Sequence, residues 1–241
     1  MAEVGEPIYF PPVTTALEGG LLRVGGQLTP DWLLAAYGRG IFPWPVIEDE
    51  WEVLAWFSPD PRAVIELDGL HVSRRLARRI RSGQFQVTLN RDFSGVISGC
   101  MAPRRDDCGT WITPEIRSAY QRLHKLGYAH SVEVWSETKL VGGLYGVALG
   151  GMFAGESMFH RERDASKIAL FCLQSHLRQR GFTLFDIQQQ TNHSKSMGAV
   201  EISREDFLLR LNRALTLPVT FGECSDCLLY TSPSPRDGLL W

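Results

Sequence analysis

Hydrophobic and polar positions change their spacing several times along the chain, and each change predicts a new element. Residues 29–31, Thr-Pro-Asp, predict a helix start, because they supply a capping side chain, a first-turn proline and a first-turn acid. Apolar residues then recur at helical spacing until Gly40, where we expect the helix to end. The prolines of residues 41–45 exclude regular helix there, because proline lacks the backbone N–H donor. Residues 55–62 then fit the end of a strand and a linker.

Beyond residue 62, helical and strand patterns are interspersed without a regular βαβ repeat. Helices are predicted where a capping residue precedes apolar positions three or four apart. These helices run from Thr113 to Gly127, over residues 165–180, and from Ser203 onward. Two-residue alternation predicts strands over residues 130–135, 140–153 and 182–188, and the glycines of the second indicate bulges or a close backbone approach. This mixture predicts an α+β (mixed α/β) fold.

The length of the chain limits its domain organisation. With 241 residues, it has room for one globular domain, or for one with a small accessory lobe. We expect a small N-terminal α/β domain over residues 1–62 and a larger domain over residues 63–222. The tail, residues 223–241, shows no periodicity and too little apolar surface to pack, so we interpret it as a non-native or disordered extension.

Composition and charge exclude several classes of protein. Hydrophobic residues make up 44% and charged residues 22% of the chain, which excludes disorder of its bulk. The formal net charge of −2 means that any nucleic-acid contact must come from local clustering of charge. No apolar run approaches the roughly 20 residues of a membrane-spanning helix, and the N-terminus lacks signal-peptide features. We therefore expect a cytoplasmic protein that does not contact membranes.

The cysteines and histidines do not predict a metal centre. Five cysteines in a chain of this length are an odd and sparse set, typical of reduced thiols inside a cell. Cys224 and Cys227 form a C-x-x-C pair, but no second pair of ligands accompanies them. The six histidines show no metal-ligand spacing. We expect neither a metal nor another cofactor.

A basic segment at residues 71–81 is the strongest local charge feature. It holds five arginines and no acid, namely Arg74, Arg75, Arg78, Arg79 and Arg81. On a helix these arginines fall on one continuous face, opposite Val72, Leu76 and Ile80. The face predicts either a phosphate-binding ridge or an ordinary solvated surface. No aromatic residue is interleaved with it, so we expect phosphate positioning rather than reading of bases.

The predicted strand at residues 182–188 carries a carboxylate among apolar side chains. Alternation places Asp186 and Gln188 on the same face of the sheet. A carboxylate in this setting is costly unless it is paired or hydrogen-bonded. We expect the side-chain amide of Gln188 to donate to Asp186, which would leave the amide carbonyl oriented elsewhere. The alternative is an edge-strand acid that is hydrogen-bonded to backbone.

Residues 155–159, Gly-Glu-Ser-Met-Phe, place a second acid at the end of the glycine-rich ribbon. Glu156 is flanked by Phe153, Met158 and Phe159. The functional interpretation is an anionic spot beside an apolar pocket, suited to a ligand with one cationic and one apolar group. The alternative is a solvent-facing turn acid beside ordinary core residues.

Signatures of covalent catalysis and phosphate-loop chemistry are missing from the sequence. It contains no G-x-S-x-G elbow, no H-E-x-x-H helix motif and no phosphate-binding P-loop, and no cysteine has an evident activating context. Direct transfer between two bound substrates is therefore favoured over a covalent intermediate.

Seven separated motifs, in this order, resemble the leucyl/phenylalanyl-tRNA–protein transferase family. They are GGxLTP at 25–30, AYxxGIFPW at 36–44, SPDPRAV at 58–64, GTWI at 109–112, HSVEVW at 130–135, GESMF at 155–159 and DxQ at 186–188, where x is a residue outside the pattern. The resemblance extends from about Phe10 to Leu215. It implies a small N-terminal domain and a GNAT-like C-terminal domain.

The resemblance also implies an activity. Members of the family are aminoacyltransferases that move Leu or Phe from aminoacyl-tRNA to the α-amine of a protein beginning with Arg or Lys. The product carries an N-degron and enters protein degradation by the N-end rule. The partners implied are the charged tRNA and the acceptor protein, and we expect a monomer without a cofactor.

Site residues follow from the resemblance position by position. Asp186 and Gln188 match the catalytic pair, and Glu156 matches the residue that faces the basic N-terminal side chain of the acceptor. Leu144, Phe153 and Met158 would line the pocket for the Leu or Phe side chain. Trp44 and Trp111 would lie near the 3′ adenosine, and the arginine helix matches the tRNA-binding patch.

Two other classes of function fit the sequence less well. An acyl-CoA-dependent N-acetyltransferase of the same fold would need the string Gln/Arg-x-x-Gly-x-Gly/Ala, and the nearest match, Arg178 to Thr183, ends in the wrong residue. A non-catalytic RNA-binding module is supported by the arginines alone, and it leaves Asp186, Gln188 and Glu156 unexplained.

Overall fold

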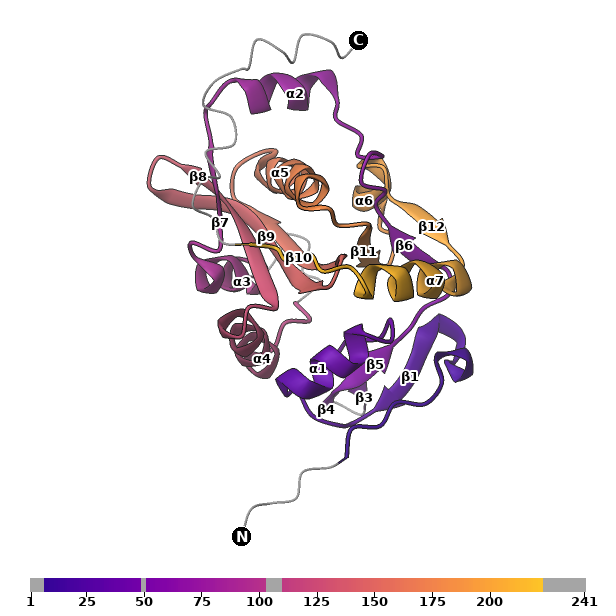
Figure 1. The fold of residues 1–241 in the computed structure, drawn as a ribbon. Coiled ribbons are helices and arrows are strands. Elements are labelled where there is room, and N and C mark those ends of the chain that lie inside the picture. Colours follow the sequence, from indigo (N-terminus) through magenta and orange to yellow (C-terminus); the bar gives the residue numbers. More distant parts are fainter. Residues whose placement is uncertain (1–6, 49–50, 103–109, 223–241) are drawn as a thin grey trace.

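Two sheets of unequal size organise the chain (Figure 1). The computed structural model describes residues 7–48, 51–102 and 110–222. A small antiparallel sheet has the strand order β1-β5-β2, and a large mixed sheet has the order β12-β6-β11-β10-β9-β8-β7. The strands β3 and β4 form a separate pair. The predicted mixed α/β class is confirmed for the described residues.

The strands have the following bounds: β1 Leu21–Val24, β2 Phe42–Pro43, β3 Val46–Glu48, β4 Trp51–Val53, β5 Ala55–Phe57, β6 Arg62–Val64, β7 Gln86–Leu89, β8 Ala129–Ser136, β9 Lys139–Leu149, β10 Met152–His160, β11 Leu184–Gln188 and β12 Val200–Ile202. The α-helices are α1 Pro30–Tyr37, α2 Arg74–Arg81, α3 Phe93–Met101, α4 Pro114–Lys125, α5 Ala165–Arg180, α6 Asn192–Ser196 and α7 Arg204–Leu215. Two short 3₁₀ turns, η1 Val13–Thr15 and η2 Glu18–Gly20, precede β1.

The helix ends follow the capping residues that the sequence supplies. The hydroxyls of Thr29, Thr113 and Ser203 accept hydrogen bonds from backbone N–H groups in the first turns of α1, α4 and α7. Helix α5 ends at Gly181, which adopts a left-handed φ of 82°. The predicted helices are confirmed, as are the strands predicted at 130–135 (β8) and 182–188 (β11). Residues 140–153 contain two strands, β9 and the first part of β10, joined by a turn.

Each face of the large sheet is covered by its own apolar core. Helices α1, α3, α4 and α7 contribute to one core, and α2 and α5 contribute to the other (Figure 1). Every strand pair of the large sheet is antiparallel except β10 with β11. In that parallel pair, Met152 lies opposite Leu184 and Ala154 lies opposite Asp186. The sheet is therefore mixed, and its parallel pair lies near its centre.

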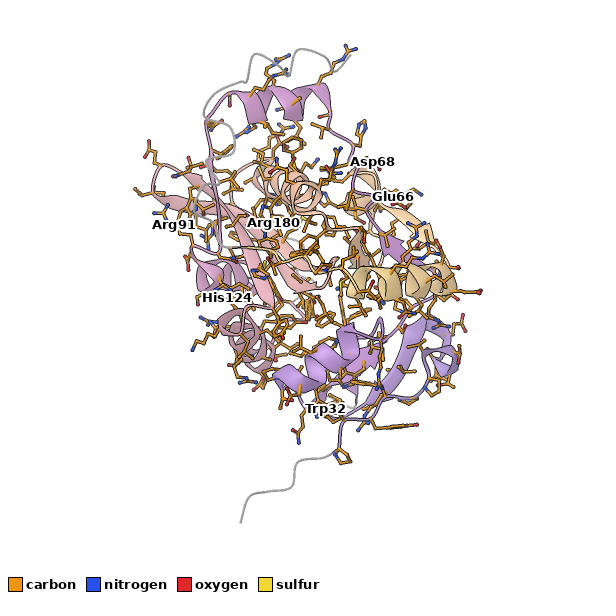
Figure 2. All side chains as sticks on the ribbon, in the orientation of Figure 1. Trp32, Glu66, Asp68, Arg91, His124 and Arg180 are labelled. Carbon is orange, nitrogen blue, oxygen red and sulfur yellow. The ribbon has the colours of Figure 1, made fainter. Side chains whose placement is uncertain are left out.

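The first core joins the N-terminal part to the large sheet. It contains Trp32, Leu33 and Tyr37 of α1 together with Tyr120 of α4 and Phe207 of α7. Side chains fill the space between α1 and the large sheet, and Trp32 lies on α1 below that sheet (Figure 2). The division near residue 62 stays a prediction, and the tail 223–241 lies outside the described residues, as does Cys108.

Two bulges shift the pairing register of the central strands. The register of β10 against β9 shifts between Gly155 and Ser157, and Glu156 is the extra residue. The register of β11 against β6 shifts between Asp186 and Gln188, and Gln188 has a left-handed φ of 60°. Despite these shifts, Leu184 lies in the first core, and the hydrogen-bond partners of Asp186 and Gln188 lie on the same side of the sheet, whereas Phe185 and Ile187 lie against the other core. The predicted alternation of faces along β11 is therefore confirmed.

The described helices and side chains show neither a membrane span nor a metal cluster. Across those residues, every helix is too short or too polar to traverse a bilayer. In the same part of the chain, no group of His, Cys, Asp and Glu side chains is arranged to hold a metal ion. Cys100 and Cys172 are buried in different cores, and Cys224 and Cys227 are not among the described residues.

We expect Gly40→Ala to destabilise the fold more than Gly25→Ala. Both glycines have left-handed φ values, 73° and 82°, so alanine is strained by about 1–2 kcal/mol at either position. A Cβ at Gly40 would lie 2.8 Å from the buried ring of Phe207, whereas a Cβ at Gly25 would meet nothing within 4 Å. Overpacking should add about 1–3 kcal/mol for Gly40→Ala. Urea unfolding measures both, and equal losses would contradict this packing.

Candidate active site

A carboxylate on β10 forms the centre of a hydrogen-bonded cluster. Glu156 Oε1 accepts from Tyr37 Oη at 2.8 Å and from Gln188 Nε2 at 2.9 Å, while Oε2 accepts from Tyr120 Oη at 3.0 Å. The donors come from α1, α4 and β11, so both parts of the chain contribute. Glu156 is half-buried within β10, not at a solvent-facing turn. Its predicted place at the end of the ribbon is wrong, because β10 continues to His160.

Burial controls the charge of this cluster. Desolvation raises the pKa of Glu156 to about 7, and the hydrogen bonds from Tyr37 and Tyr120 oppose that rise. Burial also raises the pKa of both tyrosines well above its usual value, so they remain donors. A carboxylate offers about four lone-pair positions, and three are occupied here. Glu156 can therefore accept one further donor, such as a ligand cation.

The Gln188 side chain points to Glu156 and not to Asp186. Its backbone N–H donates to Asp186 Oδ1 at 2.9 Å, while its side-chain Nε2 donates to Glu156. The predicted side-chain bond to Asp186 is wrong: with its left-handed φ, Gln188 presents its backbone N–H to Asp186 and leaves its side chain to Glu156. When Glu156 is ionised, its carboxylate can only accept, so Nε2 then faces Glu156. The carbonyl oxygen of Gln188 is therefore turned away from Glu156 and can accept from a ligand.

Asp186 is paired with an arginine that the sequence analysis missed. Arg62 Nε and Nη2 donate to the two carboxylate oxygens at 2.8 and 2.7 Å, and both side chains are at most 2% exposed. The sequence pattern correctly required a partner for a carboxylate among apolar residues. The available signal was an arginine at the start of the apolar run 62–65, since a charge in a buried strand needs a partner as well.

Tyr37 and Tyr120 were also missed as members of the site. Both occupy apolar positions of amphipathic helices, and each is at most 1% exposed. The helical spacing explains why both side chains are buried, but it does not indicate the hydrogen-bond partners of their hydroxyl groups. A buried phenol usually needs a hydrogen-bond partner, which is a signal that could have singled them out.

The residues expected to line an apolar pocket belong to the core on the α5 face of the large sheet, whereas Tyr37 and Tyr120 belong to the other core. Leu144 and Met158 face each other across β9 and β10, with Leu144 buried and Met158 half-buried. Phe153 has no exposed surface and packs against Phe185 and Phe221. It therefore does not line an open surface in this structure. Two surface hollows of about 410 and 770 Å³ lie elsewhere, and neither is lined by Glu156 or Gln188.

Trp44 and Trp111 are brought together from distant parts of the sequence. Their rings stack with centroids 5.1 Å apart and an interplanar angle of 16°. Trp44 is 38% exposed and Trp111 is half-buried. The pair is an aromatic platform on which a flat ligand could stack.

The arginine segment forms α2, which lies outside α5 (Figure 1). Leu76 is buried beneath it, and Arg74, Arg75, Arg78 and Arg81 are exposed. Arg79 is half-buried and its guanidinium lies 5.2 Å from the ring of Phe85. The exposed ridge therefore contains four of the five predicted arginines, because Arg79 packs on its flank.

Family models and curated relatives agree on one family. A model described as "Leucyl/phenylalanyl-tRNA protein transferase" matches residues 64–212, and one described as the N-terminal domain of the same transferase matches residues 26–60. A leucyl/phenylalanyl-tRNA–protein transferase of Alkalilimnicola ehrlichii is 53% identical over 87% of this chain and 81% of its own. One of Aromatoleum aromaticum is 54% identical over 82% of this chain and 83% of its own.

Among solved structures, "The structure of L-PGS from Bacillus licheniformis" is 14% identical, with a TM-score of 0.38, and covers 68% of this chain and 52% of that one. The family models and the relatives, by contrast, define one class of protein, the tRNA-dependent protein transferases. Within that class, this chain belongs to the leucyl/phenylalanyl-tRNA protein transferase family.

We expect Glu156→Gln to change how stability depends on pH. The pKa of Glu156 is raised to about 7 by folding, so between pH 4.5 and 7 the unfolded chain loses this proton first. The free energy of unfolding of the natural protein should therefore fall across that window, by on the order of 1–3 kcal/mol relative to the variant. Urea unfolding from pH 5 to pH 8 measures the difference.

The matched control is Glu115→Gln on α4. A hydrogen bond from the backbone N–H of Glu115 to its own carboxylate lowers the pKa of Glu115. The contribution of Glu115 to folding stability is therefore complete above the usual pKa of a glutamate and is lost only at lower pH. The control should show no trend between pH 5 and pH 8. A flat profile for Glu156→Gln as well would show that the Glu156 carboxyl is not desolvated.

Proposed function

We propose that this protein transfers Leu or Phe from aminoacyl-tRNA to the α-amine of a protein that begins with Arg or Lys, creating an N-degron. The observation that carries the acceptor half of the proposal is the contact between Glu156 and Gln188. It combines an anion that has one free acceptor position with an amide carbonyl directed away from that anion. An N-terminal Arg or Lys presents the complementary pair of groups, a cationic side chain and an amine.

On the acceptor side, the basic side chain occupies the remaining position on Glu156. The α-amine then donates a hydrogen bond to the carbonyl oxygen of Gln188. This bond directs the lone pair of the amine nitrogen toward the ester. An α-amine has a pKa of about 7.7–8.0, so only part of it is neutral at pH 7. Gln188 orients the neutral amine, and an amide oxygen is too weakly basic to remove its proton.

The reaction itself needs no covalent intermediate. The amine nitrogen attacks the ester carbonyl carbon, the new C–N bond forms, and the C–O bond to the ribose breaks. The ribose oxygen ends with a proton and the amine has lost one. The ester is already activated, so the protein supplies positioning, which contributes up to about 7–11 kcal/mol in ideal cases.

On the donor side, three groups of residues would hold the aminoacyl-tRNA. Stacking of the 3′ adenosine on Trp44 and Trp111 would contribute about 1–3 kcal/mol. Leu144, Met158 and Phe153 would surround the Leu or Phe side chain, which requires Phe153 to become accessible. The exposed arginines of α2 would contact tRNA phosphates.

The large sheet is assigned, within this proposal, to a GNAT-like domain. The parallel pair β10 and β11 at the centre of an otherwise antiparallel sheet supports the assignment. One chain supplies every group named above, so the proposal needs a monomer only. Aminoacyl-tRNA as substrate would place the reaction in the cytoplasm.

We expect the purified protein to join Phe to a peptide that begins with Arg when it is given Phe-tRNA. The product is detected by mass spectrometry as a peptide lengthened by one Phe at its N-terminus. A peptide with an acetylated N-terminus should not react, because its nitrogen has no free lone pair for attack. Acetyl-CoA in place of Phe-tRNA should give no product. Acetylation of the peptide in place of aminoacylation would contradict this function and would indicate an acyl-CoA-dependent N-acetyltransferase.

We expect reversal of Arg74, Arg78 and Arg81 to Glu to weaken tRNA binding and to reduce its salt dependence. Each lost phosphate contact should reduce the slope of log K against log[salt] by roughly 0.7–0.9. The measurement is a titration of tRNA at several salt concentrations. The matched control reverses the exposed Arg163, Arg178 and Arg213, which changes the net charge equally at positions that do not belong to α2. Equal effects of the two triple variants would mean that α2 is only a solvated surface.

A further inference from the structure

We propose that Arg62 is a positioning residue for the transfer: it acts through Asp186 and Gly40 to hold Gln188 and the Trp44 segment in their places relative to one another. This inference rests on the proposed function. It also assigns Asp186 the role of a buried anchor that does not touch substrate.

The guanidinium of Arg62 bonds two separate segments of backbone and side chain. Nε and Nη2 donate to the carboxylate of Asp186, and Nη1 donates to the carbonyl oxygen of Gly40 at 3.0 Å. Asp186 lies on β11, whereas Gly40 lies in the turn between α1 and β2. One rigid, planar group therefore fixes the distance between the large sheet and the N-terminal part.

Aromatic rings hold this guanidinium in place. Its central carbon lies 4.9 Å from the ring centroid of Phe42 and 4.4 Å from that of Phe207. Arg62 is 1% exposed, so water does not compete for its hydrogen bonds. The planar fork of arginine fits this setting, and the compact ammonium of lysine cannot reproduce its three directed bonds.

Asp186 transmits the position of Arg62 to Gln188 through the main chain. The same Oδ1 accepts from Arg62 Nε and from the backbone N–H of Gln188. That N–H bond supports the left-handed φ of Gln188, which directs its side chain to Glu156. Asp186 is 1% exposed and has both oxygens engaged, so it acts on the reaction through Gln188 rather than as a base.

Gly40 transmits the position of Arg62 to the other substrate groups. Its N–H donates to the carbonyl of Tyr37, the residue that bonds Glu156. Four residues further on, Trp44 stacks on Trp111. Arg62 thus connects the amide proposed to hold the amine with the aromatic pair proposed to hold the adenosine.

The first test is Arg62→Lys, which keeps the charge and removes the fork. We expect kcat for transfer to fall roughly 10- to 100-fold, because small misplacements have effects of this size. The salt dependence of tRNA binding should stay unchanged, since the arginines of α2 are intact. The matched control is Arg210→Lys on α7: Arg210 also bonds two carboxylates, those of Glu66 and Asp206, but it is 34% exposed. That variant should transfer at the natural rate.

A double variant separates positioning from simple stability. Arg62→Met with Asp186→Leu replaces the ion pair by apolar groups, which proteins often tolerate without loss of stability. We expect it to fold, as judged by circular dichroism and urea unfolding, yet to lose transfer as Arg62→Lys does. A folded double variant that transfers at the natural rate would overturn the proposal.

Asp186→Asn distinguishes an anchor from a base. The asparagine oxygen can still accept from the Gln188 N–H, so some transfer should remain, with the same shape of the pH–rate profile. Loss of the basic-limb plateau, or a profile shifted along the pH axis, would show that Asp186 carries a proton in the reaction and would overturn the assignment.

A measurement without substrate keeps this inference separate from the proposed function. In ¹⁵N-labelled protein, Arg62→Lys should move the signals of the Gln188 side-chain amide and of the Trp44 indole together, while Arg210→Lys moves neither. If the natural protein does not transfer Phe, the proposed function is wrong. These signals still show whether Arg62 holds Gln188 and Trp44 in place. Unmoved signals in Arg62→Lys would overturn the inference.

Discussion

The buried ion pair between Arg62 and Asp186 is the constraint on which the arrangement of the site depends. Removing two charges from water is expensive, and the attraction between them offsets that cost only when the geometry is good and the remaining donors are bonded. Here the fork meets the carboxylate with two short bonds, a third bond reaches Gly40, and two aromatic rings enclose the cation. The pair fixes β6, β11, α7 and the turn after α1 to one another, so neither sheet can shift without breaking it.

The carboxylate of Glu156 meets its cost of burial differently. It has hydroxyl and amide donors but no direct cationic partner among the described residues, and burial therefore raises its pKa to about 7. Asp186 thus has a cationic partner within the protein, whereas the donors to Glu156 are all uncharged. A basic side chain from an acceptor protein would supply a positive charge there. The two acids lie on adjacent parallel strands, and their different partners give them different roles.

Much of the fold was predictable because its signals are local. The caps at Thr29, Thr113 and Ser203 and the stop at Gly181 depend on a few neighbouring residues, and the structure confirms them. The hydrogen-bond partners in the central strands were less predictable. Alternation placed Asp186 and Gln188 correctly on one face, but the Gln188 amide bonds Glu156 of the neighbouring strand and not Asp186. Which strands become neighbours, and in which register, is not contained in the sequence of a single strand.

The sequence by itself determined the elements, the family resemblance, and the fact that a carboxylate at position 186 had to have a partner. These conclusions rest on hydrogen bonds and periodicities within one segment, or on the cost of a charge among apolar residues. Only the tertiary structure decided that the partner is Arg62, that Tyr37 and Tyr120 bond Glu156, and that Trp44 stacks on Trp111. The two partners of each pair lie on separate elements, and their separation in the sequence ranges from 36 to 124 positions. Their geometry is therefore set by how the sheets and helices pack.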